Sequence, residues 1–95
     1  MNIKEIREKY KDSKPTTILL RDLIIEAEIK SMPDKPLMGE LIILDDGTGT
    51  LEAAAKDSQT FELLKKCLGK TITIKGYLEK HEYDDLAFTV EKILY

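Results

Sequence analysis

The sequence predicts a small all-β protein with one or two short helices. Apolar and polar residues alternate with period two in several segments, which is typical of half-buried strands. Clusters of glycine, proline and aspartate separate these segments and favour turns. The chain has 95 residues, of which 42% are hydrophobic and 35% charged. This size and balance are those of one folded domain with a modest core.

The first segment is a candidate helix followed by a linker. Apolar residues recur at i, i+3 and i+7 over Ile3–Tyr10, which predicts a short helix. A helix of this length is unstable alone, so it must dock on the rest of the domain or fray. The Lys14-Pro15 pair ends the pattern. We therefore assign residues 1–16 to a helix and linker and residues 17–95 to the β domain. The helix is then a packing appendage or, alternatively, an arm that contacts a partner.

Five segments are predicted strands, and turn-forming residues separate them. We expect Arg21-Asp22 to form an irregular joint within the first strand and Gly76 to mark a bulge or bend in the fourth. The predicted strands are Leu23–Ser31 with Thr17–Leu20 leading into it, Glu40–Leu44, Thr50–Lys56, Thr71–His81 and Leu86–Leu94. The connecting loops and turns are Ser31–Gly39, Asp45–Gly49 and Glu82–Asp85.

The period changes between the third and fourth strands, which predicts a helix. Asp57 or Ser58 can cap its first turn, because either side-chain oxygen can accept from a free backbone amide. Gly69 is placed to end the helix in a left-handed conformation with positive φ. The apolar stripe of this helix consists of Phe61, Leu64 and Leu68.

The resulting element order is three strands, one helix and two strands. This is the order of the OB-fold, a partly open barrel that binds nucleic acids and oligosaccharides. We therefore predict a five-stranded OB-fold barrel with its helix between strands 3 and 4. The residues expected in the core of the sheet are Ile29, Ile72, Ile74, Phe88 and Val90.

Three stretches of sequence resemble the OB domains of replication protein A. Leu41–Leu51 resembles the segment from strand two to strand three, in which apolar residues precede an Asp-x-(Thr/Gly)-Gly turn. Thr71–Gly76 is similar to the family's fourth strand, and Leu20–Ile29 to its first. The resemblance covers about Thr17–Leu94. It implies a non-catalytic module of a larger single-stranded DNA-binding protein, with the strand held in a groove across strands 2 and 3.

Two positions differ from the pattern of that family. Glu52 lies where the family can carry a basic residue, and Lys56 lies where it often carries a stacking tryptophan. Stacking of a base on an aromatic ring contributes about 1–3 kcal/mol per base. A groove in this chain would therefore depend on lysines for phosphates and on tyrosines for bases. The candidate nucleic-acid-binding residues are Lys30, Lys35, Lys56, Lys75, Tyr77, Lys80 and Tyr83.

The overall charge limits how nucleic acid could be bound. Fifteen Lys and Arg stand against 18 Asp and Glu, which gives a net charge of −3. A protein held on nucleic acid by bulk electrostatics is normally basic, so any contact must come from a local patch. The same lysines have an ordinary alternative role, because charges on strands deter edge-to-edge aggregation.

Other chemistries find no support in the sequence. Asp45 and Asp46 precede a glycine as turn-forming residues do, without the spacing of a calcium loop. The chain has one histidine, His81, and one cysteine, Cys67, too few for a zinc site. No phosphate-binding glycine loop or nucleophile motif occurs. We expect no enzyme activity, no cofactor and no metal.

The expected setting is cytoplasmic. A single cysteine cannot form an internal disulfide, which favours a reducing compartment. No apolar run approaches the ~20 residues that cross a bilayer, and the first residues do not resemble a signal peptide. We therefore expect single-stranded DNA and neighbouring OB domains or subunits as partners, and no membrane.

Two other functions remain open at this point. One is a structural or protein-interaction OB domain, which the acidic composition and the missing tryptophan favour. The other is an RNA-binding domain of the anticodon-binding type.

Overall fold

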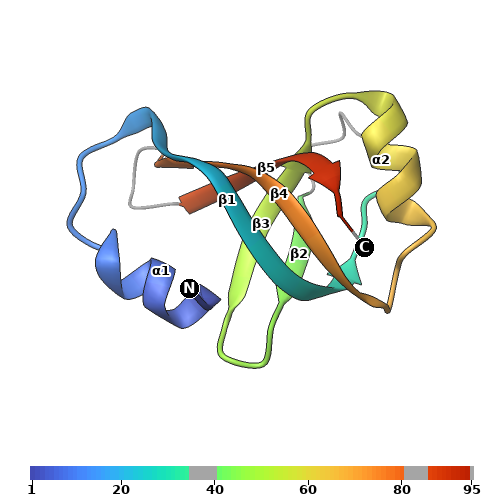
Figure 1. Ribbon diagram of the computed structural model, residues 1–95, viewed down its shortest axis with the longest axis horizontal. Helices are drawn as coiled ribbons and strands as arrows, with labels where there is room; N and C mark the ends of the chain where they lie inside the picture. The colour runs from blue at the N-terminus through green and yellow to red at the C-terminus, as the bar shows by residue number, and fades with distance from the viewer. Residues whose placement is uncertain (35–40, 81–85, 95) are drawn as a thin grey trace.

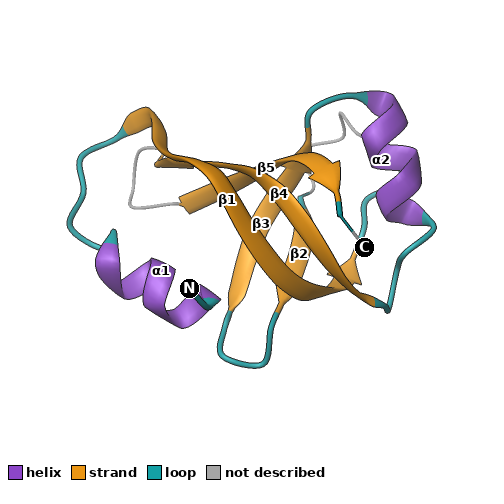
Figure 2. Cartoon of the chain, in the orientation of Figure 1, coloured by secondary structure: helices purple, strands orange, loops and turns teal. Residues whose placement is uncertain are grey.

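A computed structural model of the chain describes residues 1–34, 41–80 and 86–94. It is mostly β, with two short helices (Figure 2). The elements in chain order are α1 (Ile3–Lys9), β1 (Thr16–Ser31), β2 (Ile42–Asp45), β3 (Thr50–Ala55), α2 (Ser58–Lys65), β4 (Thr71–Lys80) and β5 (Leu86–Ile93). The structure confirms the predicted mainly β content with short helices, the five strands and the helix between strands 3 and 4. Neither helix has the length or the apolar character needed to cross a membrane.

The five strands form one sheet that closes on itself in the order β1-β2-β3-β5-β4, with β4 returning to β1. Every neighbouring pair is antiparallel except β3 and β5, which run parallel. The two helices lie at opposite ends of this closed sheet (Figure 1). Side chains on the inner face of every strand therefore meet in one core. All five core residues predicted from the strands are buried in it.

Strand β1 pairs with both β4 and β2, and it is irregular at Asp22 within the part that pairs with β4. It pairs with β4 as far as Glu28 and with β2 from Glu28 to Ser31. The β1–β4 register shifts between Leu20 and Leu23, and Asp22 between them has a φ of 55°. Aspartate tolerates this left-handed conformation better than most residues. The predicted irregular joint is therefore confirmed.

Gly76 allows β4 and β5 to approach more closely than any other residue would. A Cβ atom at this position would overlap the backbone carbonyl oxygen of Thr89 on β5. The β4–β5 register shifts at the same point, between Lys75 and Gly76. The irregularity that the sequence predicts at this glycine is therefore present, but the extra residue, Glu91, lies on β5 opposite Gly76, and the alternation of β4 is unbroken.

Helix α2 begins as predicted but ends earlier. Asp57 is its N-cap, with Oδ1 accepting from the backbone amide of Thr60 at 2.7 Å. That hydrogen bond holds the pKa of Asp57 below its ordinary value. Phe61 and Leu64 are buried as expected, whereas Leu68 is 50% exposed.

The early end of α2 explains why Leu68 leaves the predicted stripe. The helix stops at Lys65, and the next residues form tighter turns with i→i−3 hydrogen bonds. Leu68 therefore no longer follows the helical spacing. Gly69 has the predicted positive φ, 81°, and its amide donates to the carbonyl of Ile29 on β1 at 2.9 Å. It joins the helix region to the sheet rather than capping the helix directly.

Helix α1 docks on the other end of the closed sheet. Its two apolar residues, Ile3 and Ile6, are fully buried in the common core. The turn between β2 and β3 caps its first residues. Asp46 Oδ2 accepts from the amide of Ile3 at 2.8 Å, and Thr48 Oγ1 accepts from the amide of Lys4 at 3.2 Å. The predicted docking of this helix is confirmed.

Gly76→Ala should destabilise the protein strongly, because the new methyl group meets rigid β5 backbone. We expect a loss of about 3 kcal/mol or more in the free energy of unfolding, at the upper end of overpacking costs. Gly69→Ala is the matched control. A Cβ there meets nothing within 4 Å. Only the positive φ opposes it, at about 1 kcal/mol. Urea unfolding measures the free energy of unfolding of both variants. Equal losses in Gly76→Ala and Gly69→Ala would contradict the close approach of β4 and β5.

Asp46→Asn should weaken the docking of α1 at neutral pH but not in acid. Partial burial raises the pKa of Asp46, but hydrogen bonds from the Thr48 hydroxyl and from backbone amides including that of Ile3 outweigh this, so the pKa lies below its ordinary value. The stabilisation is then present above the unfolded pKa of about 3.9 and is lost as pH falls through the folded pKa. We expect a wild-type advantage of about 0.3–1 kcal/mol at pH 7. Urea unfolding at several pH values should show this advantage shrinking below about pH 4.

Candidate nucleic-acid interface

The outward side chains of β2 and β3, where the groove was predicted, carry no positive charge, and the nearest described cation is Arg7 of α1, whose Nε donates to the carbonyl of Thr50 at the edge of this face at 2.7 Å. Its outward positions are Ile43 and Asp45 on β2, and Thr50, Glu52 and Ala54 on β3. None of these five is a lysine, an arginine or an aromatic residue. The polar residues among them can neither neutralise phosphates nor stack on bases.

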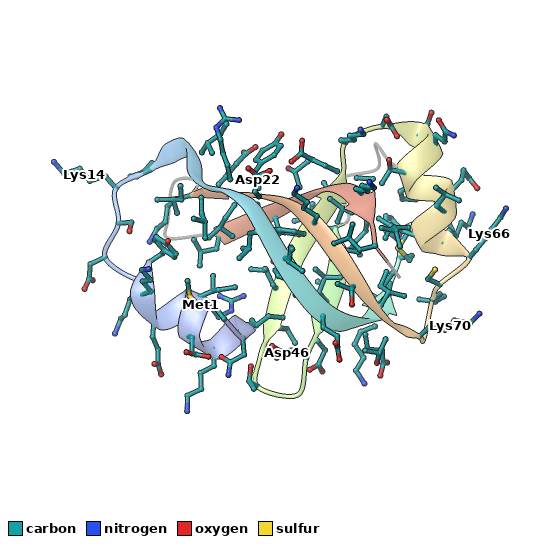
Figure 3. The ribbon with its side chains drawn as sticks, in the orientation of Figure 1. Met1, Lys14, Asp22, Asp46, Lys66 and Lys70 are labelled. Carbon is teal, nitrogen blue, oxygen red and sulfur yellow. The ribbon has the colours of Figure 1, made fainter. Side chains whose placement is uncertain are left out.

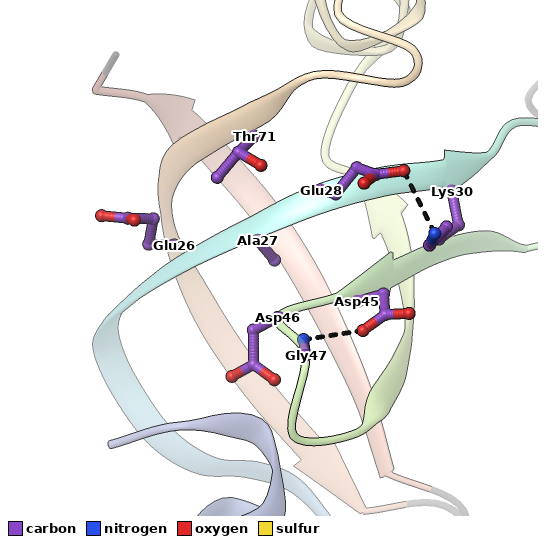
Figure 4. A pocket seen from close by; sticks show the side chains of 8 residues that line it. All are labelled: Glu26, Ala27, Glu28, Lys30, Asp45, Asp46, Gly47 and Thr71. Carbon is purple, nitrogen blue, oxygen red and sulfur yellow. Dashed lines mark hydrogen bonds and ion pairs between the residues drawn. The ribbon is translucent and has the colours of Figure 1, made fainter.

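An acidic depression of about 310 Å³ lies beside this face, between β1 and the β2–β3 turn (Figure 4). Glu26 and Glu28 line it from β1, and Asp45 and Asp46 line it from the end of β2 and the turn. Lys30, a predicted binding residue, also lines it. Its Nζ lies 3.4 Å from Glu28 Oε2, so its charge is already partly compensated. This depression repels a nucleic-acid backbone.

A second depression, of about 320 Å³, is rich in lysine. Lys56 follows β3, Lys75 lies on β4 and Lys92 on β5, and the depression also contains Asp22 and Glu91. Lys75 Nζ lies 3.6 Å from Asp22 Oδ1, with 40% and 77% of the two side chains exposed. We call Lys56, Lys75 and Lys92 the lysine cluster. It brings together two of the residues that the sequence predicts.

The two depressions lie on different sides of the molecule. Asp22 lines the lysine-rich depression and Asp46 lines the acidic one, and Figure 3 shows them on opposite sides of the closed sheet. The charge separation is therefore a property of the folded surface. A net charge of −3 does not describe either side.

Tyr77 lies on the same side of β4 as Lys75. The burial of β4 alternates, with Gly76 and Leu78 buried and Lys75 and Tyr77 half-buried. Because side chains two residues apart on a strand share a face, the Tyr77 ring projects from the outer face beside the lysine cluster. This position agrees with the outward orientation predicted from the sequence.

Lys80 is not on the outer surface, and the prediction that it faces outward is wrong. It is 2% exposed, and its Nζ donates to the backbone carbonyls of Tyr10 at 2.7 Å and Lys11 at 2.8 Å. These carbonyls belong to the end of α1 and the residue after it. Lys80 therefore anchors the C-terminal end of α1 to the end of β4.

Several sequence expectations concern residues outside the described parts of the chain. Lys35 and Tyr83 are among them, as are most of the loop over Ser31–Gly39 and the hairpin loop over Glu82–Asp85. Cys67 is described and is half-buried against the core. Within the described residues, no group of three or more histidine, cysteine, aspartate or glutamate side chains is arranged to hold a metal ion.

Lys92 is the one member of the lysine cluster that sequence reasoning missed. Strict alternation from Leu86, Phe88 and Val90 points residue 92 into the core. The signal that could have revealed it is the run Glu91-Lys92-Ile93, in which two charged residues precede an apolar one and break the period.

No known protein family matches the chain, and no curated protein is significantly similar to it. Its function is therefore inferred from the fold and from the distribution of charge on its surface.

Lys80→Met should destabilise the protein, because it removes the donor that holds Tyr10 and Lys11. Methionine keeps most of the apolar stem, so the loss reflects hydrogen bonds from a charged group, about 1–3 kcal/mol. Lys14→Met is the control, because Lys14 is an exposed residue of the linker. Urea unfolding should separate the two variants. Equal stability of Lys80→Met and Lys14→Met would show that Lys80 does not anchor α1.

Proposed function

We propose that the chain is an OB-fold module that binds single-stranded DNA without catalysis. The architecture supports the OB-fold assignment. Five strands close in the order β1-β2-β3-β5-β4, β3 and β5 run parallel, and α2 connects β3 to β4 at one end of the sheet. The OB-fold is a five-stranded barrel that commonly binds oligonucleotides.

The observation that carries the proposal is the meeting of Lys56 and Lys75 in one depression. Both were selected from the sequence as phosphate-binding residues, and residues 56 and 75 reach this surface from different elements. Lys92 adds a third positive charge beside them. Lysine ammonium groups bind a phosphate backbone by neutralising its charge and releasing its counterions.

The binding should be weak, because few charges take part. Three lysines share the depression with Asp22 and Glu91, so its local charge is only slightly positive. The logarithm of affinity for a single strand falls with the logarithm of salt by about 0.7 for each phosphate contact. A shallow salt dependence is therefore the expected signature. In a larger protein, neighbouring modules joined to this one by linkers would add their own contacts with the strand and so raise the overall affinity.

A protein-interaction module is the second candidate, and the acidic depression favours it. Glu26, Glu28, Asp45 and Asp46 gather negative charge over the surface that would otherwise hold a strand. Such a surface steers and orients a basic partner protein. This candidate predicts no affinity for any oligonucleotide at low salt.

Replacing Lys56 and Lys75 together by alanine should weaken binding of a fluorescent oligothymidine several-fold and reduce the salt slope by about 1.4, two phosphate contacts. The matched control is the double variant Lys65→Ala/Lys66→Ala at the exposed end of α2, which removes the same charge. Fluorescence anisotropy at two salt concentrations measures both quantities. The same titration with an RNA of equal length separates a DNA module from an RNA module.

Two results would contradict the proposal. One is the absence of oligothymidine binding by the wild-type chain at low salt, which supports the protein-interaction module. The other is an equal loss of affinity in the two double variants, because general electrostatic attraction would then explain the binding.

A further inference from the structure

We propose that the β4–β5 bulge builds the phosphate-binding site, and that a single strand lies across β1, β4 and β5 rather than in the groove over β2 and β3. This inference rests on the proposed function and assigns the surface that performs it. Four observations support it: the effect of the bulge on Lys92, the unfavourable pairing of two lysines, an apolar surface beside them, and the acidic character of the alternative face.

The bulge determines where Lys92 points. In β5, Leu86, Phe88 and Val90 are buried, and a regular strand would next bury residue 92. Instead Glu91 and Lys92 are both exposed and Ile93 is 9% exposed. The pairing of Lys75 with Lys92 and of Gly76 with Val90 leaves Glu91 as the extra residue. The bulge thus turns Lys92 outward and places it opposite Lys75.

Two lysines opposite each other on neighbouring strands repel, and such pairs destabilise a sheet. Asp22 is within ion-pair distance of Lys75, but both side chains are well exposed and their attraction is screened. Lys56 adds to the positive charge, since its backbone amide donates to the carbonyl of Val90 at 3.0 Å and so holds this residue against β5. Asp22 and Glu91 offset part of this positive charge, and a bound phosphate would offset the remainder.

An apolar surface lies in the same row as the lysines. Ile24 on β1 pairs with Lys75 on β4 and is 52% exposed. Because residues paired across a sheet share a face, Ile24, Lys75 and Lys92 form one row over three neighbouring strands. Tyr77 is the next outward residue of β4, about 7 Å along the strand. Ile24 and Tyr77 can contact bases while the lysines contact phosphates, which is how single strands are bound.

The alternative path over β2 and β3 meets negative charge at two of its five outward positions. Asp45 and Glu52 project from that face, and the acidic depression adjoins it. A strand placed there would bring phosphates towards carboxylates with no lysine on the face to offset them. The row over β1, β4 and β5 is the better path on electrostatic grounds.

Nuclear magnetic resonance of the 15N-labelled 95-residue chain, titrated with oligothymidine at low salt, locates the bound strand. We expect the largest amide shifts with oligothymidine at Ile24, Gly76, Tyr77, Thr89 and Lys92, and small shifts at Ile43 and Ala54. Inorganic phosphate serves as a second probe, and we expect it to shift Lys92 but not Tyr77. Equal shifts at Tyr77 from both probes would overturn the assignment of a base-contacting surface.

Lys92→Gln supplies the matching affinity measurement. It should weaken oligothymidine binding several-fold and lower the salt slope by about 0.7, one phosphate contact. Lys66→Gln on the far end of α2 removes the same charge and should change neither quantity. Unchanged affinity in Lys92→Gln would overturn the site.

The outcomes also separate this inference from the proposed function. Oligothymidine binding with its largest shifts at Ile43, Glu52 and Ala54 would overturn the β4–β5 site and leave single-strand binding intact. The absence of shifts anywhere in the described residues would overturn both.

Discussion

The close approach of β4 to β5 at Gly76 is the contact on which both the core and the charged surface depend. The Thr89 carbonyl oxygen occupies the space that a Cβ atom would need. Glycine permits the bulge, and the bulge lets Ile93 fill the core while Lys92 turns outward. One backbone contact therefore links the closure of the sheet to the composition of its outer face.

The ends of the closed sheet are covered by helices that polar contacts hold in place. Asp46 and Thr48 satisfy the first amides of α1, and Lys80 binds the carbonyls at its other end. A helix of seven residues has little stability of its own, so these contacts and the burial of Ile3 and Ile6 keep it folded. Lys80, which the sequence places among the candidate binding residues, thus has a structural role, as does the turn residue Asp46.

Negative and positive side chains gather on different sides of the folded protein, which the net charge of −3 does not reveal. Carboxylates gather over β1 and the β2–β3 turn, and the lysine cluster lies over the end of β3, β4 and β5. If the chain binds single-stranded DNA as we propose, the negative side would prevent a strand from wrapping around the barrel and confine it to one face. The same negative side remains available to a basic protein partner. The two candidate functions would then use opposite sides of one module.

The sequence by itself determined the elements and the core. Period-two alternation, the cap at Asp57 and the irregular joint at Asp22 act within a few residues, so local chemistry was enough to predict them. Only the tertiary structure decided which charges face solvent together. Lys80 is buried because α1, about 70 residues earlier in the chain, returns to cover it. Lys92 faces outward because the closure at Gly76 shifts the register of β5, and Lys56 joins it through contact between β3 and β5. These outcomes depend on contacts between segments far apart in sequence, which local periodicity cannot report.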